Sequence, residues 1–375
     1  MAVHPGAPSA GRPAKRLCSA LLFIAIIQPI LPWANAQALP PRLRSALRDH
    51  MGAKEHQLKT VEGGGIVTYS VDTGVADEIM LVGVARIWAT PSAFVSHYRE
   101  IIKFESGPGI LAQRKFSVPP VESDLAGLNL SREEADEIRK CRPGKCAFKI
   151  GAPGMKFLQS AVNWNSSDYV HQATQAVHTL WLQYLVRYQN TGDKGLAVYH
   201  DSEQQFSVGQ GLQELVSRSS ALQEYAPQLA TYLRDYPASK SASTEEFFYW
   251  QVGAFGLKPV HRVTHVAIQK TPAAWGEAYV IADKMLFASH YFRSALELQY
   301  LIPGQDQNVG GMHYLVSVQR SYVDGITGFR GRMMRTIAVR KAREAMKRHI
   351  ASVKATVERD FNRASTQSQK PPTSR

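Results

Sequence analysis

The chain has 375 residues, of which 44% are hydrophobic and 20% are charged, a composition typical of soluble globular proteins. This composition excludes a fibrous or a disordered chain, and the length suits one large domain or two ordinary ones. The chain is basic, because 44 Lys and Arg residues outnumber 31 Asp and Glu residues and give a net charge of +13 at pH 7.

The first 36 residues have the pattern of a secretory signal peptide. Arg12, Lys15 and Arg16 precede the apolar run LCSALLFIAIIQPIL, and WANAQA supplies an A-x-A cleavage site that ends at Ala36. The apolar run is shorter than the roughly 20 residues of a membrane-spanning helix. We therefore expect a cleaved signal and a periplasmic or secreted protein.

The charge of the exported part suggests its surroundings. Cleavage removes three basic residues and no acidic residue, which leaves 41 Lys and Arg against 31 Asp and Glu, a net charge of +10. Outside the cytoplasm, a basic surface suits anionic lipid headgroups or envelope polymers better than nucleic acid. We expect no nucleic-acid partner, and a merely soluble basic protein is an equal alternative.

The segment 37–122 predicts strands, a helix and a further strand. GGGIVTYSVD and DEIMLVGVARIWA contain β-branched residues in partial alternation, which favours two strands joined at TGVA. Thr90 as N-cap and Pro91 at the first helical position predict a helix over 90–104. GILAQRKFSV returns to strand character before Pro119 and Pro120.

The segment 123–257 predicts helices. Ser131 stands three residues before Glu134, a capping box that begins a helix over LSREEADEIRK. Shorter helices are expected around Leu212, around Leu229 and over STEEFFYWQ, residues 243–251. Helical spacing also predicts a long amphipathic helix with one apolar stripe, formed by Val170, Ala173, Val177, Leu180 and Tyr184.

Cys141 and Cys146 lie just after the first of these helices, in IRKCRPGKCAFKI. They are the only cysteines left after cleavage, because Cys18 belongs to the signal peptide. Tetrahedral zinc needs four ligands, and no second cysteine pair or tight histidine pair is nearby. Redox motifs use the shorter C-x-x-C spacing. In an oxidising compartment we expect a disulfide that stabilises a small turn by less than roughly 3 kcal/mol.

The segment 258–362 predicts four strands and a long helix. Short connections separate VHRVTHVAI, AYVIADKML, SHYFRSALELQYLI and MHYLVSVQRSYVD, so neighbouring strands should be antiparallel. The helix that follows has one apolar stripe: Phe329, Met333, Ile337, Met346, Ile350, Val353, Val357 and Phe361. Residues 363–375 are polar, and we expect a disordered tail.

The predicted fold class is therefore α+β, an antiparallel sheet packed on a long C-terminal helix. The helical segment 123–257 is either a lid or a separate domain. The C-terminal helix also has a basic face, which either touches an anionic membrane surface or, as the favoured interpretation, is merely solvated. That face comprises Arg335, Arg340, Lys341, Arg343, Lys347 and Arg348.

The common catalytic signatures are absent from the sequence. There is no P-loop and no nucleophile elbow, and GQGLQE lacks the third glycine of a dinucleotide-binding turn. His261 and His265 have the spacing of a helical zinc pair, but on a strand they would lie roughly 13 Å apart. We expect no metal and no cofactor.

The richest polar cluster is ASHYF, followed by Glu297. His290 is a candidate general base and Tyr291 a candidate hydrogen-bond donor, and the favoured alternative is a hydrogen-bonded histidine beside a packed tyrosine. On one unbroken strand, His290 would face away from Tyr291 and Glu297. Arg320 and Asp324 form a candidate ion pair, which either grips a ligand or holds the start of the helix.

The stretch VGVARIWATPSAFVSHYREIIKF resembles the first strand and following helix of the START and polyketide-cyclase superfamily, the helix-grip domains. The antiparallel strands and final helix over 259–362 extend the resemblance, from which the segment 123–257 departs. It implies a sheet curled around the last helix and a cavity for a lipid, sterol or other apolar ligand. The chain is also similar to secreted bacterial proteins that carry no assigned activity.

The resemblance leads to a ranked set of functional hypotheses. We expect first an exported protein that binds an apolar or lipid-like molecule between the sheet and the C-terminal helix. The expected ligand-binding residues are Tyr291, Tyr314, Arg320, Phe329 and Met333. The second hypothesis is a non-catalytic interaction or structural protein of the cell envelope. The third is an envelope enzyme that uses His290.

Overall fold

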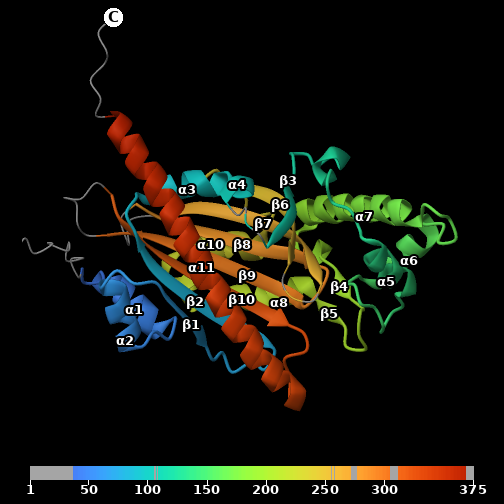
Figure 1. Ribbon diagram of the computed structural model, residues 1–375, viewed down its shortest axis with the longest axis horizontal. Helices are drawn as coiled ribbons and strands as arrows, with labels where there is room; N and C mark the ends of the chain where they lie inside the picture. The colour runs from blue at the N-terminus through green and yellow to red at the C-terminus, as the bar shows by residue number, and fades with distance from the viewer. Residues whose placement is uncertain are drawn as a thin grey trace, which may run out of the picture. The chain divides into compact units, whose positions relative to one another are not determined.

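The computed structural model describes residues 37–104, 107, 109–254, 256, 258–271, 277–304 and 311–368. The predicted signal peptide and the end of the predicted tail lie outside the described residues. Within them, the segments 37–122 and 258–362 contribute to one large sheet, which has helices on both faces (Figure 1).

The sheet has eight strands, and every neighbouring pair is antiparallel. Its strand order is β1-β2-β10-β9-β8-β7-β6-β3. Strands that follow one another in the chain are neighbours from β6 to β10, and β10 then pairs with β2 near the start of the chain. This confirms the α+β class. The strands are β1 (Val67–Val71), β2 (Glu78–Ile87), β3 (Ile110–Lys115), β6 (Thr244–Ala254), β7 (Pro259–Thr271), β8 (Ala278–Ala288), β9 (Phe292–Pro303) and β10 (His313–Val323).

A helical layer, inserted between β3 and β6, covers one face of the sheet (Figure 1). The Tyr184 hydroxyl fastens this layer to β8 by donating to the Leu286 carbonyl over 2.6 Å. A two-stranded ribbon, β4 (Val198–Tyr199) and β5 (Phe206–Ser207), lies in the same insertion. Its helices are η1 (Glu122–Leu125), α5 (Arg132–Lys140), α6 (Ala152–Ala161), α7 (Tyr169–Thr191), η2 (Gly192–Gly195), α8 (Val208–Ser217), α9 (Ser220–Tyr225) and α10 (Pro227–Asp235).

The opposite face carries α3 (Pro91–Arg99), α4 (Ile101–Phe104) and the long helix α11 (Gly328–Ser368). The Thr90 hydroxyl caps α3 by accepting from the Ala93 N–H, as the sequence predicts. α11 crosses β1 and β2 at close range, because Gly83 has no side chain there: a Cβ atom would collide with Ile350 and Met346. We call the face that carries α3, α4 and α11 the α11 face, and the face that the helical layer covers the insertion face.

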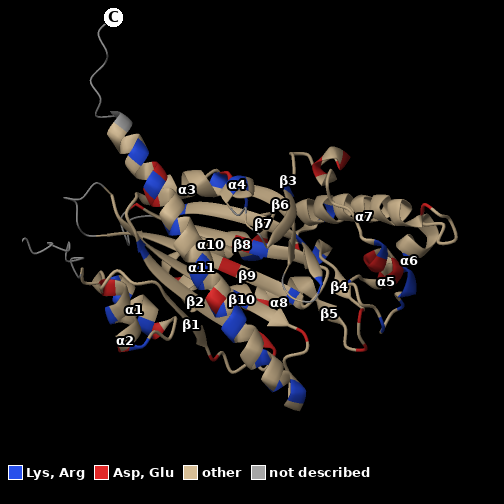
Figure 2. Cartoon of the chain, in the orientation of Figure 1, with Lys and Arg blue, Asp and Glu red and all other residues tan. Residues whose placement is uncertain are grey.

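The alternation of each strand divides its side chains between the two faces. In β10, Tyr314 and Val318 join the hydrophobic cluster under the insertion, whereas Leu315 joins the cluster under α11. In α11, the predicted stripe is buried only in its second half, at Met346, Ile350, Val353 and Val357. Figure 2 shows Lys and Arg along the outer side of this helix.

Two predictions of local structure were wrong, and one segment had no prediction. Residues 243–251 form most of β6 and not a helix, because four consecutive aromatic residues favour a strand and β3 and β7 satisfy its backbone groups on both sides. The polar lead-in contains two helices, α1 (Pro41–Asp49) and α2 (Glu55–Glu62). α11 continues to Ser368, into the tail that was expected to be disordered.

The cysteine prediction is confirmed. A disulfide joins Cys141 and Cys146 directly after α5, whose capping box of Ser131 and Glu134 forms as expected. Arg142 and Lys145 face each other in the turn that the disulfide closes. The bond therefore holds a short surface turn between α5 and α6.

Candidate functional site

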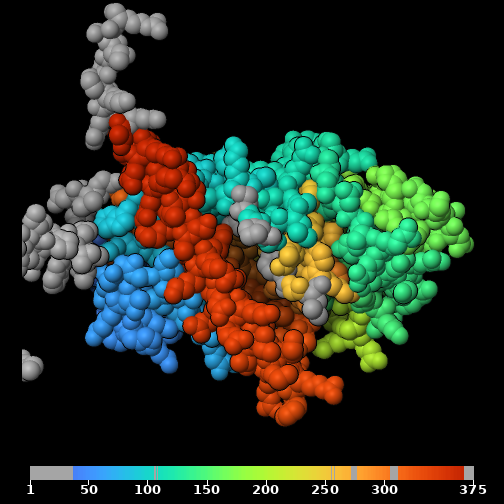
Figure 3. All heavy atoms as spheres, in the orientation of Figure 1, coloured from blue at the N-terminus to red at the C-terminus, as the bar shows by residue number. Residues whose placement is uncertain are grey.

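A hollow opens on the α11 face, between α11 and the segment that contains α3 and α4 (Figure 3). α11 lies on β1 and β2, and α3 lies on one end of β8 and β9, so the middle of the sheet is covered less. Three polar side chains on this face of β8, β9 and β10 are partly exposed, whereas most of the sheet is buried. They are Asp283, Glu297 and Gln319.

These three residues form one row across the sheet. Asp283 is the register partner of Glu297 in β8 and β9, and Glu297 is the register partner of Gln319 in β9 and β10. Directly opposite residues have Cβ atoms about 4.5–5.5 Å apart, so the two carboxylates are neighbours. Because like charges opposite each other repel, a hydrogen-bond donor or a cation placed between them is favourable.

The neighbouring polar side chains orient the carboxylates. Tyr98 of α3 donates its hydroxyl hydrogen to Asp283, and Gln299 Nε2 lies 3.3 Å from the Tyr98 oxygen. Glu297 accepts from the Ser317 hydroxyl and from Gln319 Nε2, each over 3.0 Å. We name these six residues the acidic floor: Tyr98, Asp283, Glu297, Gln299, Ser317 and Gln319.

Apolar side chains adjoin the acidic floor. Val266 is the register partner of Asp283, and Ile281 is the register partner of Gln299. Both belong to the hydrophobic cluster that also contains Tyr249 and Met346. The floor is thus a polar island within an apolar surface, an arrangement typical of pockets that orient an otherwise apolar ligand.

His290 and Tyr291 lie elsewhere, in the turn between β8 and β9. Tyr291 has a φ of +62°, and β9 begins only at Phe292, so the expected unbroken strand that carries Tyr291 and Glu297 is wrong. The Tyr291 hydroxyl accepts from the Lys258 N–H over 2.9 Å. Its carbonyl accepts from the Asp324 N–H over 2.8 Å, so Tyr291 ties the turn to the start of β7 and the end of β10.

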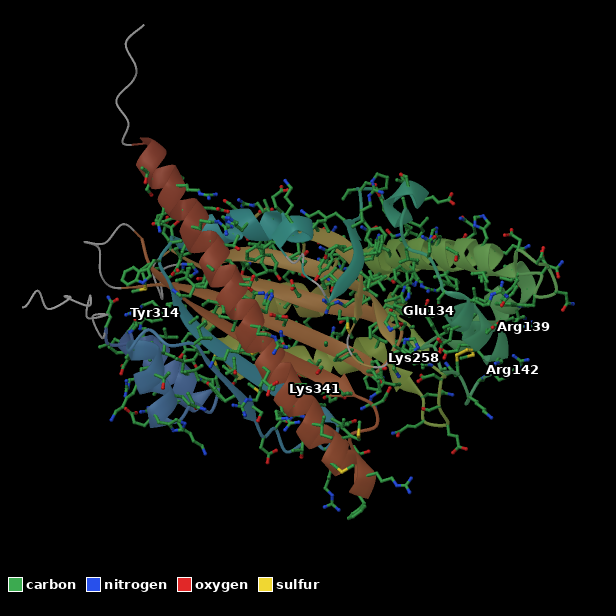
Figure 4. The ribbon with its side chains drawn as sticks, in the orientation of Figure 1. Glu134, Arg139, Arg142, Lys258, Tyr314 and Lys341 are labelled. Carbon is green, nitrogen blue, oxygen red and sulfur yellow. A yellow bond between two sulfur atoms is a disulfide. The ribbon has the colours of Figure 1, made fainter. Side chains whose placement is uncertain are left out.

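The turn belongs to a buried cluster of histidines and glutamates where α5 meets the sheet. Figure 4 shows Glu134 and Lys258 at this junction, beside the disulfide turn with Arg139 and Arg142. His261 Nε2 lies 2.6 Å from Glu134 Oε1. His290 Nε2 lies 3.6 Å from Glu137 Oε2, and Glu137 also pairs with Lys258.

The electrostatics of this cluster suit a structural role. Burial lowers the pKa of His290 more than Glu137 raises it, so His290 is neutral at pH 7. Burial alone would raise the pKa of Glu134, but hydrogen bonds from His261 and Ser131 outweigh burial and lower it. His290 is 5% exposed and Ser289, whose hydroxyl lies 2.8 Å from His290 Nδ1, is fully buried. This geometry offers a substrate little access to either side chain.

The five expected ligand-binding residues do not meet in one place. Tyr291 lies in the turn described above, and Tyr314 and Arg320 lie on the insertion face, away from α11. Phe329 and Met333 are 87% and 65% exposed near the start of α11. Side chains alternate between the two faces along β10. The even-numbered residues Tyr314 and Arg320 therefore point away from α11, the helix that was expected to cover them.

The expected ion pair of Arg320 and Asp324 is also wrong. Arg320 pairs with Glu78 of β2, and its Nη2 lies 2.6 Å from Glu78 Oε1. Asp324 instead pairs with Lys149 and with Arg293, whose Nε lies 3.2 Å from Asp324 Oδ1. Glu78 is 242 residues from Arg320 along the chain, so no local pattern identifies this partner.

His261 and His265 point into separate clusters, as their positions on β7 imply. His265 Nδ1 lies 2.9 Å from the Tyr188 hydroxyl, and His265 Nε2 lies 3.1 Å from Glu246 Oε2. In the described part of the chain, no three His, Cys, Asp or Glu side chains are placed to hold a metal ion. The helices described here also include none with the length and hydrophobicity that crossing a bilayer requires.

Comparison with known proteins adds no assignment to this geometry. The chain matches no protein-family model, and no curated protein or solved structure is significantly similar to it. The function is therefore inferred from the side chains and their arrangement alone.

Proposed function

We propose that this chain binds an amphiphilic small molecule in the hollow between α11 and the α3–α4 segment. The observation that carries the proposal is the pair Asp283 and Glu297, opposite each other and partly exposed on the floor of the hollow. Two adjacent carboxylates call for a ligand group with hydrogen-bond donors, such as an ammonium or several hydroxyls. The surrounding cluster of Val266, Ile281 and Met346 suits an apolar body.

The order of elements supports this proposal. A strand, a helix that begins with proline, further antiparallel strands and a long final helix across the sheet are the features on which the helix-grip resemblance rests. That resemblance implies a ligand between the sheet and the last helix. Because the carboxylates of the acidic floor accept hydrogen bonds, the lipid-like ligand that we expect has a head group with several hydrogen-bond donors.

We propose further that the protein works outside the cytoplasm, in the periplasm or after secretion. The Cys141–Cys146 disulfide supports this location, because disulfides persist in oxidising compartments. The sequence of residues 1–36, with its basic start, apolar run and A-x-A site, supports export.

Native mass spectrometry and calorimetry with matched probes test the ligand proposal. Decylamine and decanoate share an apolar chain and differ in head charge, so decylamine should bind in the hollow and decanoate should not. Glu297→Gln and Asp283→Asn should each weaken decylamine binding by about tenfold or more, since each removes a charged hydrogen-bond acceptor. Glu277→Gln is the matched control, because Glu277 is 79% exposed and pairs with Lys270 on the surface.

Two results would contradict the proposal. Equal weakening of decanoate and decylamine binding by Glu297→Gln would show that the carboxylates do not select the charge of the ligand. Unchanged decylamine binding in both acidic-floor variants would place the ligand elsewhere. Solvent extraction of the exported protein would then identify any molecule that it carries.

A second function is favoured by the start of α11. Phe329, Met333 and Met334 are 87%, 65% and 50% exposed, and they share this stretch with Arg330 and Arg332. Residues 328–343 contain no Asp or Glu. We propose that this end of α11 docks on an anionic membrane surface, because exposed apolar side chains enter the interface while each cation near it contributes about 1 kcal/mol.

Vesicle sedimentation tests the docking proposal. Vesicles of phosphatidylglycerol should bind the protein at low ionic strength and release it at physiological ionic strength, and vesicles of phosphatidylcholine should not bind it. Phe329→Ser combined with Met333→Ser should weaken sedimentation. The matched control is Val186→Ser, at an exposed apolar residue of α7. Binding that is independent of lipid charge or of both serines would refute this surface.

A further inference from the structure

A second cavity lies on the insertion face, separated from the hollow by the sheet itself. Its volume is about 210 Å³. The floor comes from β2, β9 and β10, and the walls come from the end of β1 and from the junction of α8 and α9. Its size is below the roughly 300–1,000 Å³ of sites for drug-sized ligands, so it suits a small molecule.

The polar end of the cavity is a buried arginine with its counter-ion. Arg320 is 4% exposed and Glu78 is fully buried. Arg320 donates to Glu78 Oε1 from Nε over 2.7 Å and reaches the Ser219 hydroxyl from Nη1 over 3.4 Å. Arg218 lines the same cavity, with its Nη2 3.5 Å from Glu78 Oε2 and 2.9 Å from the Thr73 carbonyl.

These three charged groups leave one positive charge, since Glu78 offsets only one of the two guanidinium groups. Asp72 also lines the cavity, but it is exposed and accepts from the Gly74 N–H at the rim. Arg218, 36% exposed, lies at the rim as well, so solvent screens Arg218 and Asp72 more than it screens the buried pair. Arg218 faces the cavity beside Glu78 whereas Asp72 accepts from its own turn, so the hydrogen-bond donors of the lining favour a ligand with a single negative charge.

Tyr300 supplies a hydrogen-bond donor to the cavity. This side chain is 1% exposed and lines the cavity, yet its hydroxyl has no hydrogen-bond partner among the residues that the structure describes. Burial raises the pKa of Tyr300, so its hydroxyl is a neutral donor at pH 7. A bound acceptor would therefore gain a hydrogen bond from this hydroxyl without displacing a protein partner.

The other walls of the cavity are apolar. Met80, Leu298 and Val318 project from the sheet, and Met51 and Ala221 close the sides. All five residues are buried in the hydrophobic core under the insertion. A ligand that enters therefore places an apolar body on the sheet and an acceptor against Tyr300 and the arginines.

We propose that this cavity binds a small monocarboxylate with an apolar body, such as a short-chain fatty acid or an aromatic acid. The carboxylate accepts hydrogen bonds from Arg218, Arg320 and Tyr300. Glu78 holds Arg320 in place and excludes a second negative charge. The site does not depend on the ligand of the hollow, because it uses the opposite face of the sheet.

Calorimetry with benzoate, benzamide and phthalate tests the site. Benzoate should bind, whereas benzamide has the same shape without the charge and phthalate adds a second charge, so both should bind at least tenfold more weakly. Arg218→Gln should weaken benzoate binding about tenfold or more, because a hydrogen bond to a charged group is lost. Tyr300→Phe keeps the packing and should weaken it several-fold.

Two control variants separate this site from others. Arg234→Gln removes an exposed arginine of α10 that pairs with Asp235, and it should leave benzoate binding unchanged. Glu297→Gln should also leave it unchanged, which distinguishes this cavity from the hollow. Equal binding of benzoate and benzamide, no binding of benzoate, or full binding by both Arg218→Gln and Tyr300→Phe would overturn the proposal.

Discussion

The two faces of the sheet hold their charged groups in different ways. On the insertion face, a buried cation meets a carboxylate from another element, as in Lys284 with Asp193 and Arg320 with Glu78. On the α11 face, Asp283 and Glu297 lie side by side and partly exposed. A buried charge must be paired because desolvation is costly, whereas adjacent like charges repel each other and are favoured where they are partly exposed.

The two arrangements distinguish charged side chains that stabilise the fold from charged side chains that we expect to contact a ligand. Two pairs on the insertion face join the sheet to other chain segments: Lys284 reaches η2, and His261 reaches α5. These contacts position the insertion on the sheet. The acidic floor is built mainly by the sheet itself: Glu297 accepts from Ser317 and Gln319 of β10, and of the two carboxylates only Asp283 is joined to a helix, through Tyr98. This contrast predicts opposite responses to mutation on the two faces.

The largest effect is expected at Lys284. This side chain is fully buried, and its Nζ lies 2.5 Å from Asp193 Oδ1 and 2.7 Å from the Leu233 carbonyl. Lys284→Met should lower the free energy of unfolding by about 3–5 kcal/mol, because it leaves Asp193 buried without its cation. Urea denaturation measures the change.

Lys270→Met is the matched control, because the pair of Lys270 and Glu277 is exposed and should contribute at most about 0.5 kcal/mol. Adding Asp193→Asn to Lys284→Met should recover part of the loss. Equal effects of Lys284→Met and Lys270→Met would remove the distinction between the two faces.

A pH-dependent loss of stability is expected from His313, at the covered end of the α11 face. Burial lowers the pKa of His313 to about 4, and its Nδ1 lies 2.7 Å from the Ala89 carbonyl. The unfolded chain binds a proton near pH 6.5 and the folded chain does not, so stability falls as the pH decreases from 6.5 to 4. The loss attributable to this residue is about 3 kcal/mol.

Thermal unfolding of the wild-type protein and of His313→Gln over this pH range measures the contribution of His313. The variant should lose less stability on acidification than the wild type does. His349→Gln serves as the control, because that side chain is only partly buried on α11. Parallel pH profiles of the wild type and His313→Gln would show that His313 is protonated in the folded state at ordinary pH.

A smaller effect is expected for the disulfide. Cys141→Ser combined with Cys146→Ser opens a loop of only a few residues, so the loss should be about 2 kcal/mol on the chain-entropy model. Hydrogen exchange should increase in α5 and in the turn after it, and not in the sheet. A loss of protection throughout the sheet would show that the turn is required for the whole fold.

The strands and the C-terminal helix were predictable because their patterns are local. Alternation and short connections identify β7 to β10, and helical spacing identifies the stripe from Met346 to Val357. β6 was not predictable in this way, since its strand character depends on β3 and β7, which the sequence does not place beside it. Phe329 and Met333 continue the apolar stripe but extend beyond the surface that buries it.

The candidate site was predictable only in part. Glu297 is a polar residue within a mainly apolar strand, and the same is true of Asp283 and Gln319. Their proximity depends on the register of three strands, which no single segment encodes. Tyr98 reaches Asp283 from a helix 185 residues away along the chain. Arg320 was expected to pair with Asp324, and its partner Glu78 could be identified only from the fold.

The smallest effect on stability is expected at the acidic floor. Glu297→Gln should leave the free energy of unfolding unchanged or raise it by up to about 1 kcal/mol, because it removes the repulsion with Asp283 and keeps an acceptor for Ser317. A double-mutant cycle with Asp283→Asn isolates the repulsion, which should appear as an unfavourable coupling of about 0.5–1 kcal/mol in the wild type. A loss of 2 kcal/mol or more in Glu297→Gln would instead mark a structural carboxylate, as on the insertion face, and would remove the reason to place a ligand in the hollow.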